Sequence, residues 1–241
     1  MIYMRDYQKE FENRVEFIRG VLRDADAEGI TYGNSGGKDS TLVGILCKAA
    51  CDNTLGVIIP CGLYRNYNED SSDAKRAAEQ YGIDTRIVDL SRTRESFIKL
   101  LKPKEKAVIN IAPRMRMIIL YSIAADENRL VAGTGNRSEG YMGYFTKWGD
   151  GAYDFNPIAD LTVTEVYEFL RYLDAPDSII SKAPSAGLFD GQTDEIEMGV
   201  TYSQIDNFIL NGVVSEYAED IISKYHDASE HKRRLPLVYN G

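Results

Sequence analysis

A glycine-rich segment at residues 33–41, Gly-Asn-Ser-Gly-Gly-Lys-Asp-Ser-Thr, constrains the fold of this chain more than any other feature. The apolar run at residues 29–32 before it is typical of a strand, and the run at residues 42–50 after it is typical of a buried helix. A turn between a strand and a helix points backbone N–H groups and the positive end of the helix at an anion. Glycines let the backbone approach that anion closely. Asp39 would repel a phosphate unless a cation lay between them, so we expect Mg²⁺ to bridge Asp39 and nucleotide phosphates.

Two common phosphate-binding motifs do not fit this segment. The Walker A motif needs a glycine five positions before Gly37, where the chain has Tyr32. The dinucleotide fingerprint needs a glycine two positions after Gly33, where the chain has Ser35. Residues 35–40, Ser-Gly-Gly-Lys-Asp-Ser, instead resemble the pyrophosphate loop of enzymes that cleave ATP between its α and β phosphates. The alternative is an ordinary strand-to-helix turn, which seldom combines so many glycines, hydroxyl residues and acids.

The composition of the 241-residue chain is that of one globular domain. Its net charge of −9 disfavours nucleic acid as a partner. No long apolar run and no signal peptide is present, so no membrane association is expected. The odd number of cysteines, three, argues for a reducing compartment, and we expect a cytoplasmic protein. Cys47 and Cys51 lie four positions apart, but without a partner histidine or a second pair they are expected to pack in the core.

Strand-like apolar segments alternate with helical patterns along the first half of the chain. Strands are expected at residues 29–32, 54–60, 85–88 and 130–132, and helices at residues 6–26, 42–50, 70–81, 91–101 and 109–126. This alternation predicts an α/β fold with a three-layer, doubly wound parallel sheet of the Rossmann-like type. Ligands of such sheets bind beyond the carboxyl ends of the strands. The loops at residues 33–41 and 60–68 and the loop after Ala132 should therefore surround one crevice.

The second half of the chain is less regular. Residues 133–157 are rich in glycine and polar residues and are expected to form a long functional loop. Short helices are expected at residues 162–173, 177–181 and 203–210. Between them, residues 183–193 have the composition of a mobile lid.

A second group of candidate site residues follows the fourth expected strand. Glu139 would lie in the same crevice as Asp39 and would supply a second carboxylate to Mg²⁺. The alternative is that Glu139 is a solvated residue at the start of a helix. Residues 143–151 place Lys147 and Asp150 among glycines and aromatics, which is typical of ligand contacts, although the aromatics could instead belong to the core.

Together these segments resemble the ammonia-dependent NAD synthetase family, within the ATP-pyrophosphatase or adenine nucleotide α-hydrolase-like superfamily. The loop at residues 35–40 is shared by the superfamily, whereas residues 143–151 and 184–195 are more specific. Further matches are Arg114-Met115-Arg116-Met117, Gly133-Thr134-Gly135-Asn136, Ser138-Glu139 and His231-Lys232-Arg233. The resemblance runs from end to end and implies one synthetase domain over residues 1–241.

The resemblance implies a two-step reaction with three small-molecule substrates. ATP first adenylates the nicotinate carboxylate of deamido-NAD and releases pyrophosphate. Ammonia then attacks the acyl-adenylate to give NAD and AMP. The resemblance also implies a homodimer. Relatives that use glutamine carry an added amidase domain, for which these residues leave no space, so ammonia is expected to come free or from a separate partner.

The family's site residues can be carried over to the matching positions of this chain. By resemblance, ATP would contact Gly33, Ser35, Gly36, Gly37, Lys38, Asp39, Ser40, Thr134 and Ser185, and Mg²⁺ would be held by Asp39 and Glu139. Deamido-NAD would contact Arg114, Tyr144, Lys147, Asp154, His231 and Lys232. Catalysis would involve Lys147 and Asp150, with Asp150 receiving ammonia and taking its proton.

Two positions depart from the family pattern. Ser185 stands where the family usually has a threonine that touches ATP, which is a conservative change. Val163 stands where the family usually has a lysine on the ATP phosphates, and its side chain cannot supply that charge. We hypothesise that Lys38, in the variable position of the loop, supplies the charge instead.

Two other functions remain open from the residues. Another ATP pyrophosphatase, such as a tRNA thiolase or the synthetase half of GMP synthesis, would share the loop. Thiolases tend to need cysteine pairs and basic surfaces, whereas this chain is acidic and has no Cys-x-x-Cys. A non-catalytic nucleotide-binding protein would need neither the pair Asp39 and Glu139 nor the segment with Lys147 and Asp150.

Overall fold

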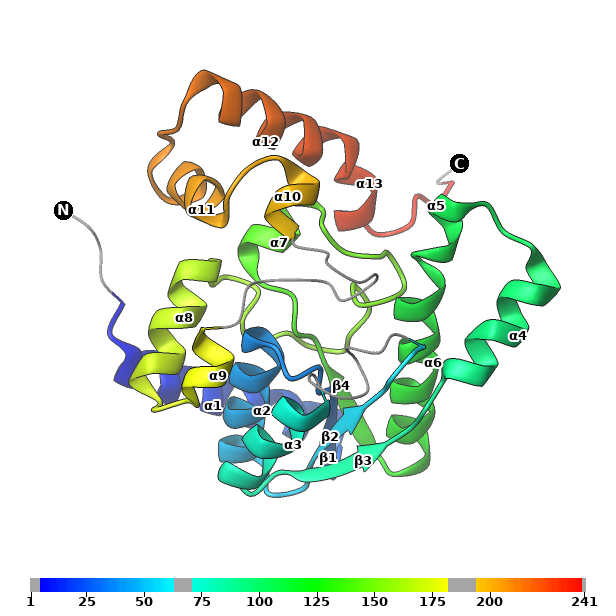
Figure 1. Cartoon of the computed structure of the whole chain (residues 1–241). Coiled ribbons are helices and arrows are strands. Elements are labelled where there is room, and N and C mark those ends of the chain that lie inside the picture. The colour runs from blue at the N-terminus through cyan, green and yellow to red at the C-terminus, as the bar shows by residue number, and fades with distance from the viewer. Residues whose placement is uncertain (1–4, 63–70, 182–193, 240–241) are drawn as a thin grey trace.

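The computed structural model describes residues 5–62, 71–181 and 194–239 and is built around a parallel sheet (Figure 1). Its strands β1 (Gly29–Gly33), β2 (Thr54–Ile58), β3 (Asp84–Ile87) and β4 (Arg129–Ala132) follow the order β3-β2-β1-β4. Ile30 of β1 lies opposite Thr54 of β2 and Leu130 of β4, and all these pairings are parallel. β1 and β2 are buried along almost their whole length, which explains why their sequences do not alternate between apolar and polar residues.

Helices cover both faces of the sheet, which confirms the predicted doubly wound fold. One layer contains α1 (Tyr7–Ala25), α2 (Lys38–Ala50), α3 (Ser71–Gln80), α8 (Val163–Tyr172) and α9 (Asp177–Ile180). The other contains α6 (Ile111–Asp126), against which α4 (Ser91–Leu101) and α5 (Glu105–Val108) pack. None of the helices in the described ranges is long and apolar enough to cross a bilayer.

The direction of winding changes at β1, and this change positions the loops. β2 lies on one side of β1 and β4 on the other, while α2 and α6 lie on opposite faces of the sheet. The segments that leave the carboxyl ends of β1 and β4 therefore diverge, and a crevice opens between them. The loop after Gly33 and the loop after Ala132 line this crevice, as the sequence predicted.

A group of short helices lies over the carboxyl end of the sheet, at the top of Figure 1. α7 (Arg137–Met142), α10 (Asp194–Met198), α11 (Tyr202–Asn211) and α12 (Glu216–Ala228) surround a third buried hydrophobic cluster, and α13 (Glu230–Arg233) follows. The prediction of an irregular loop over residues 133–157 was wrong, because α7 lies within it. α12 was missed because its buried stripe is narrow and consists of Ala218 and Ile222.

Two arginines fasten the N-terminal helix to a distant part of the chain. Arg14 is buried, and its guanidinium donates to Asp160 Oδ1 at 2.7 Å and to Asp160 Oδ2 at 2.9 Å. It also donates to Glu10 Oε2 at 2.7 Å. Arg5 Nε donates to Glu165 Oε1 at 2.7 Å. Because a buried cation is tolerated only with several partners, this network fixes the start of α1 against Asp160, before α8, and Glu165, in the first turn of α8.

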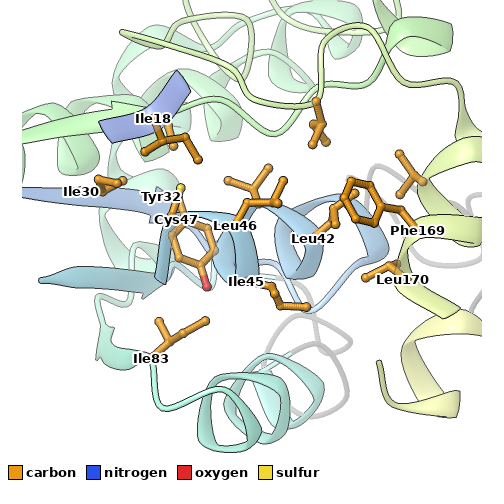
Figure 2. Packing of buried hydrophobic residues seen from close by; sticks show 14 of the residues in the cluster. Ile18, Ile30, Tyr32, Leu42, Ile45, Leu46, Cys47, Ile83, Phe169 and Leu170 are labelled. Atoms are coloured by element: carbon orange, nitrogen blue, oxygen red, sulfur yellow. The ribbon is translucent and has the colours of Figure 1, made fainter. Parts of the chain in front are cut away.

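The first buried cluster fills the space between β1 and the helices α1, α2 and α8 (Figure 2). Tyr32 of β1 is 1% exposed and points toward α2. A Cβ atom on Gly44 of α2 would lie 2.3 Å from Tyr32 Oη and 2.7 Å from Tyr32 Cζ. The helix therefore packs against the tyrosine at a distance that only glycine permits.

Replacing Gly44 by alanine should lower the free energy of unfolding by about 2 kcal/mol, because overpacking a filled core costs more than helix propensity returns. Urea unfolding would measure the change. Gly20→Ala in α1 is the matched control, because its Cβ would approach only Arg23 Nη2, at 3.8 Å. Equal stability of the two variants would show that α2 can move away from Tyr32 at little cost.

Candidate active site

A cavity of about 1170 Å³ opens at the carboxyl ends of β1 and β4. Its walls come from these strand ends and that of β2, the first turn of α2, one side of α6, the helix α7 and the segment after it, and α13. The predicted site residues in its wall are Gly33, Ser35, Gly37, Lys38, Asp39, Ser40, Thr134, Glu139, Tyr144, Lys147, Asp150 and Lys232. Ligand pockets usually measure roughly 300–1000 Å³, so this cavity has room for two nucleotide substrates.

The loop after β1 is held in place by its own side chains. Gly36 has a φ of 73°, a conformation that favours glycine, and it forms the turn without lining the cavity. Its N–H donates to Asn34 Oδ1 at 3.3 Å, and the N–H of Gly37 donates to Ser35 Oγ at 3.3 Å. The hydroxyls of Ser35 and Ser40 lie 3.0 Å apart. Hydroxyl and N–H groups thus gather at the positive end of α2, an arrangement suited to phosphate.

Two carboxylates meet in the cavity wall. Asp39 lies in the first turn of α2, and Glu139 lies in the first turn of α7. Asn136 connects them, because its side-chain amide donates to Asp39 Oδ1 at 3.1 Å and its backbone N–H donates to Glu139 Oε2 at 3.1 Å. Asp39 Oδ2 accepts from Lys38 Nζ at 2.6 Å. The crevice therefore brings together both predicted metal ligands and a buried ammonium group.

Glu139 is placed by the local sequence of α7. The side chain of Asn136 caps the helix by accepting from the N–H of Glu139 at 3.0 Å. The carboxylate of Glu139 accepts a hydrogen bond from the backbone N–H of Asn136, which completes a capping box. The spacing Asn-x-x-Glu is a sequence signal of a capping box, and it could have predicted that Asn136 caps this helix.

The carboxylate pair fits a divalent cation. Burial and the nearby Asp39 raise the pKa of Glu139, and the ammonium of Lys38 opposes that shift. Burial opposes the charge on Lys38, but Asp39 and Glu139 outweigh it and raise the pKa of the ammonium. Mg²⁺ is usually held by one or two carboxylates, with water and substrate phosphates as its other ligands. No third histidine, cysteine, aspartate or glutamate in the described ranges joins such a cluster, so substrate oxygens and water would complete the coordination.

A second cluster of charges in the same cavity contains Asp150 and Lys232. Asp150 remains accessible to solvent. The protein around it nevertheless raises the pKa of its carboxyl by desolvation. The backbone N–H of Thr146 donates to this carboxylate at 2.9 Å, and that hydrogen bond opposes part of the pKa shift. Lys232 Nζ donates to two backbone carbonyls of the segment after α7, at 2.8 Å each. Burial lowers the pKa of Lys232, and the carboxylate of Asp150 opposes that shift.

Three predicted substrate contacts, Arg114, Asp154 and His231, do not line the cavity and are exposed to solvent. Arg114 donates to the carbonyl oxygen of Lys147 at 3.3 Å, and Lys147 Nζ donates to the carbonyl oxygen of His231 at 2.5 Å. Asp154 Oδ2 accepts from a backbone N–H of β4 at 2.7 Å. Arg114 and His231 therefore contact Lys147, whereas Asp154 contacts the end of the sheet. The predicted contact Ser185 and the predicted lid at residues 183–193 lie outside the described residues.

Val163 is the first residue of α8 and belongs to the third hydrophobic cluster, where it is 3% exposed. It does not line the cavity. Lys38 does, and its Nζ lies 5.9 Å from the ring centroid of Tyr167, one turn further along α8. This position supports the hypothesis that Lys38 supplies the charge that Val163 cannot.

Sequence reasoning missed the other residues around Lys38. The ring centroid of Tyr202 lies 5.7 Å from Lys38 Nζ, and the hydroxyl of Tyr202 donates to Asp194 Oδ2 at 2.9 Å. Tyr167 and Tyr202 are separated from Lys38 by more than half of the chain and belong to no motif, so only the tertiary structure reveals them. Arg116 also lines the cavity, whereas the predicted contact Arg114 does not. The two side chains point in different directions because they lie two positions apart on the helix α6.

Asp206 of α11 is a buried carboxylate that joins three helices. It accepts from Ser138 Oγ of α7 at 2.5 Å, from Thr164 Oγ1 of α8 at 2.6 Å and from the N–H of Thr164 at 2.7 Å. Ser138 Oγ in turn accepts from the N–H of Val163 at 3.2 Å. Because Ser138 precedes Glu139, this network also fixes the helix turn that carries the second carboxylate of the site.

Replacing Asp206 by asparagine should lower the free energy of unfolding by about 2–3 kcal/mol, because an amide N–H₂ would face donors that need an acceptor. Denaturant unfolding would measure the loss. Asp220→Asn is the control, since that residue forms an exposed i,i+4 pair with Lys224 and should change stability by less than about 0.5 kcal/mol. Similar losses in both variants would contradict the bridging role of Asp206.

Comparison with known proteins identifies the family. The sequence model of the family described as NAD synthase matches residues 10–236. An NH(3)-dependent NAD(+) synthetase of Carboxydothermus hydrogenoformans is 45% identical over 240 residues, which cover 97% of this chain and 98% of that protein. Its counterpart from Thermococcus kodakarensis is 40% identical over 254 residues, with 96% and 97% covered.

Solved structures agree with this result. An NMN synthetase from Francisella tularensis has a TM-score of 0.93 at 36% identity, covering 99% of this chain and 100% of that one. An NH3-dependent NAD synthetase from Campylobacter jejuni has a TM-score of 0.83 at 28% identity, covering 98% and 100%. The family resemblance, the fold and the ligase class predicted from the motifs are confirmed. The chain belongs to the NAD synthase family.

Proposed function

We propose that this chain catalyses the ATP-dependent amidation of deamido-NAD with ammonia, through an acyl-adenylate, to give NAD, AMP and pyrophosphate. The observation that carries the proposal is the meeting of two charge clusters in one cavity. The phosphate loop with Asp39 and Glu139 suits a triphosphate, and the cluster with Asp150 and Lys232 suits a second anionic substrate and a proton transfer. The names of the curated relatives support ammonia as the nitrogen donor.

The residues of the phosphate loop would bind and orient ATP. Hydroxyls of Ser35 and Ser40 and the N–H groups of the first turn of α2 would hold the departing pyrophosphate. Thr134 would contact ATP from the other side of the crevice, and Ser185 would add a further contact. Mg²⁺ held by Asp39 and Glu139 would neutralise the negative charge that develops on the pyrophosphate.

The second cluster would bind deamido-NAD and prepare ammonia. An ammonium ion must lose a proton before its nitrogen can attack the acyl-adenylate. A carboxylate whose pKa is raised by desolvation accepts that proton more readily, which suits Asp150 as the base. Lys147 and Lys232 would place positive charge beside the anionic substrate, and the ring of Tyr144 would contact the pyridine. Arg114, Asp154 and His231 would complete this site.

The likeness to an NMN synthetase favours a second candidate substrate. Its identity of 36% exceeds the 28% found for the Campylobacter jejuni NAD synthetase. A nicotinate mononucleotide carries the same pyridine carboxylate as deamido-NAD and lacks only the second nucleotide. The same adenylation and amidation chemistry would convert it to NMN.

Incubating the protein with Mg-ATP, ammonium and either deamido-NAD or nicotinate mononucleotide distinguishes these substrates. We expect NAD, AMP and pyrophosphate in equal amounts, with a higher kcat/KM for deamido-NAD, as measured by chromatography. Asp150→Asn should lower kcat by about 10²–10⁴-fold if Asp150 is the base. Asp220→Asn, on the exposed face of α12, should leave kcat unchanged. If pyrophosphate is released only with some other acceptor, the proposed ATP chemistry of the loop would stand, but both proposed substrates would be wrong.

We further propose a cytoplasmic homodimer. The three cysteines are free, and two of them, Cys47 and Cys61, are buried, which supports a reducing compartment. Ile118 of α6 is 62% exposed, which supports this helix as the apolar surface that a second copy would cover. Light scattering is expected to give twice the chain mass, and Ile118→Glu should shift it toward the monomer. A monomeric wild-type protein would contradict this assembly.

A further inference from the structure

Lys38 occupies a position that is unfavourable for a cation. It is the first residue of α2, where the helix dipole places positive charge, and its side chain is only 6% exposed. A buried ammonium without partners is strongly destabilising. The surroundings of Lys38 must therefore supply a compensating negative charge.

Asp39 and Glu139 supply that charge, and aromatic rings hold the ammonium group in place. Lys38 Nζ lies 2.6 Å from Asp39 Oδ2, and both carboxylates raise the pKa of the lysine. The ring centroids of Tyr167 and Tyr202 lie 5.9 and 5.7 Å from Nζ, within the range of cation–π attraction. The ammonium therefore has a defined position beside Asp39 in the nucleotide-free site.

Both oxygens of Asp39 already accept a hydrogen bond. Oδ2 accepts from Lys38 Nζ at 2.6 Å, and Oδ1 accepts from the amide of Asn136 at 3.1 Å. Asn136 cannot move away at low cost, because it also caps α7. A metal ion that binds Asp39 must compete mainly with Lys38.

We propose that Lys38 is a built-in counterion that occupies the cation position on Asp39 before nucleotide binds and moves to the triphosphate when Mg-ATP arrives. The inference rests on the proposed ATP-binding function of this loop. The exchange keeps every charge paired, because the metal replaces the ammonium at Asp39 and the ammonium then neutralises phosphate oxygens. Metal binding without nucleotide should consequently be weak, since Lys38 would be left buried without a partner.

Titration with Mn²⁺, followed by electron paramagnetic resonance on the nucleotide-free protein, tests the first half of this exchange. Lys38→Met removes the competing charge while retaining volume, so its affinity for Mn²⁺ should exceed that of the wild type by at least about tenfold, or about 1.4 kcal/mol. Lys38→Arg keeps the charge and should resemble the wild type. Lys48→Met is the matched control, because Lys48 lies at the other end of α2 and donates to the carbonyl of Asp52.

The second half of the exchange, in which Lys38 moves to the triphosphate, predicts that Lys38→Met weakens nucleotide binding although it strengthens metal binding. Affinity for a non-cleavable ATP analogue with Mg²⁺, measured by calorimetry, should fall by at least about tenfold in Lys38→Met, because a charge-assisted contact to phosphate is lost. A purely structural lysine would weaken both affinities together. Thermal unfolding would check that the variants fold, and Lys38→Gln would replace Lys38→Met if the latter does not.

Three results would overturn the proposal. One is an unchanged or weaker affinity of Lys38→Met for Mn²⁺, and another is an unchanged affinity for the nucleotide. The third is Mn²⁺ binding that persists in Lys38→Met combined with Asp39→Asn, which would place the metal elsewhere. Both titrations omit deamido-NAD and ammonia, so a failure of the proposed amidation would leave their outcomes unaffected.

Discussion

Asn136 makes the hydrogen bonds on which the candidate site depends. β1 and β4 are neighbours in the sheet, but the chain leaves them in diverging directions, so Asp39 and Glu139 begin on separate helices. The amide of Asn136 spans this divergence by bonding Asp39 while its backbone bonds Glu139. Two carboxylates would otherwise repel each other across the crevice. One neutral side chain thus sets the separation of the charged groups.

The cavity lies between two parts of the fold that have their own hydrophobic clusters. The sheet and its flanking helices supply the phosphate loop, and the short helices above supply Asp194 and Lys232. Asp206 joins these parts, because it connects α11 of the upper group to α8 of the lower layer. A buried carboxylate with three donors is well suited to this task, since it fixes direction as well as distance.

The sequence predicted the parts of the structure that local chemistry determines. Local signals include the glycines around Gly36, the alternation of strands and helices, and the place of Asp39 directly after the glycines, in the first turn of α2. The helices above the sheet carry weaker ones, because α12 buries only a narrow stripe and α7 is six residues long. Tyr167 and Tyr202 reach Lys38 only through tertiary packing, which no motif encodes. The roles of individual cavity residues remain predictions.

The arginine network of α1 has a consequence for the order in which the chain can assemble during synthesis. Arg14 pairs with Asp160, which lies 146 residues later, and Arg5 pairs with Glu165, which lies 160 residues later. While the ribosome is still making the sheet, α1 can dock through the apolar stripe of Val15, Ile18 and Leu22 and through Arg19, which donates to the carbonyls of Ala49 and Ala50. Arg5 and Arg14 lack their partners Glu165 and Asp160 until about two-thirds of the chain has emerged, so the start of the N-terminal helix is locked in one of the later steps of folding.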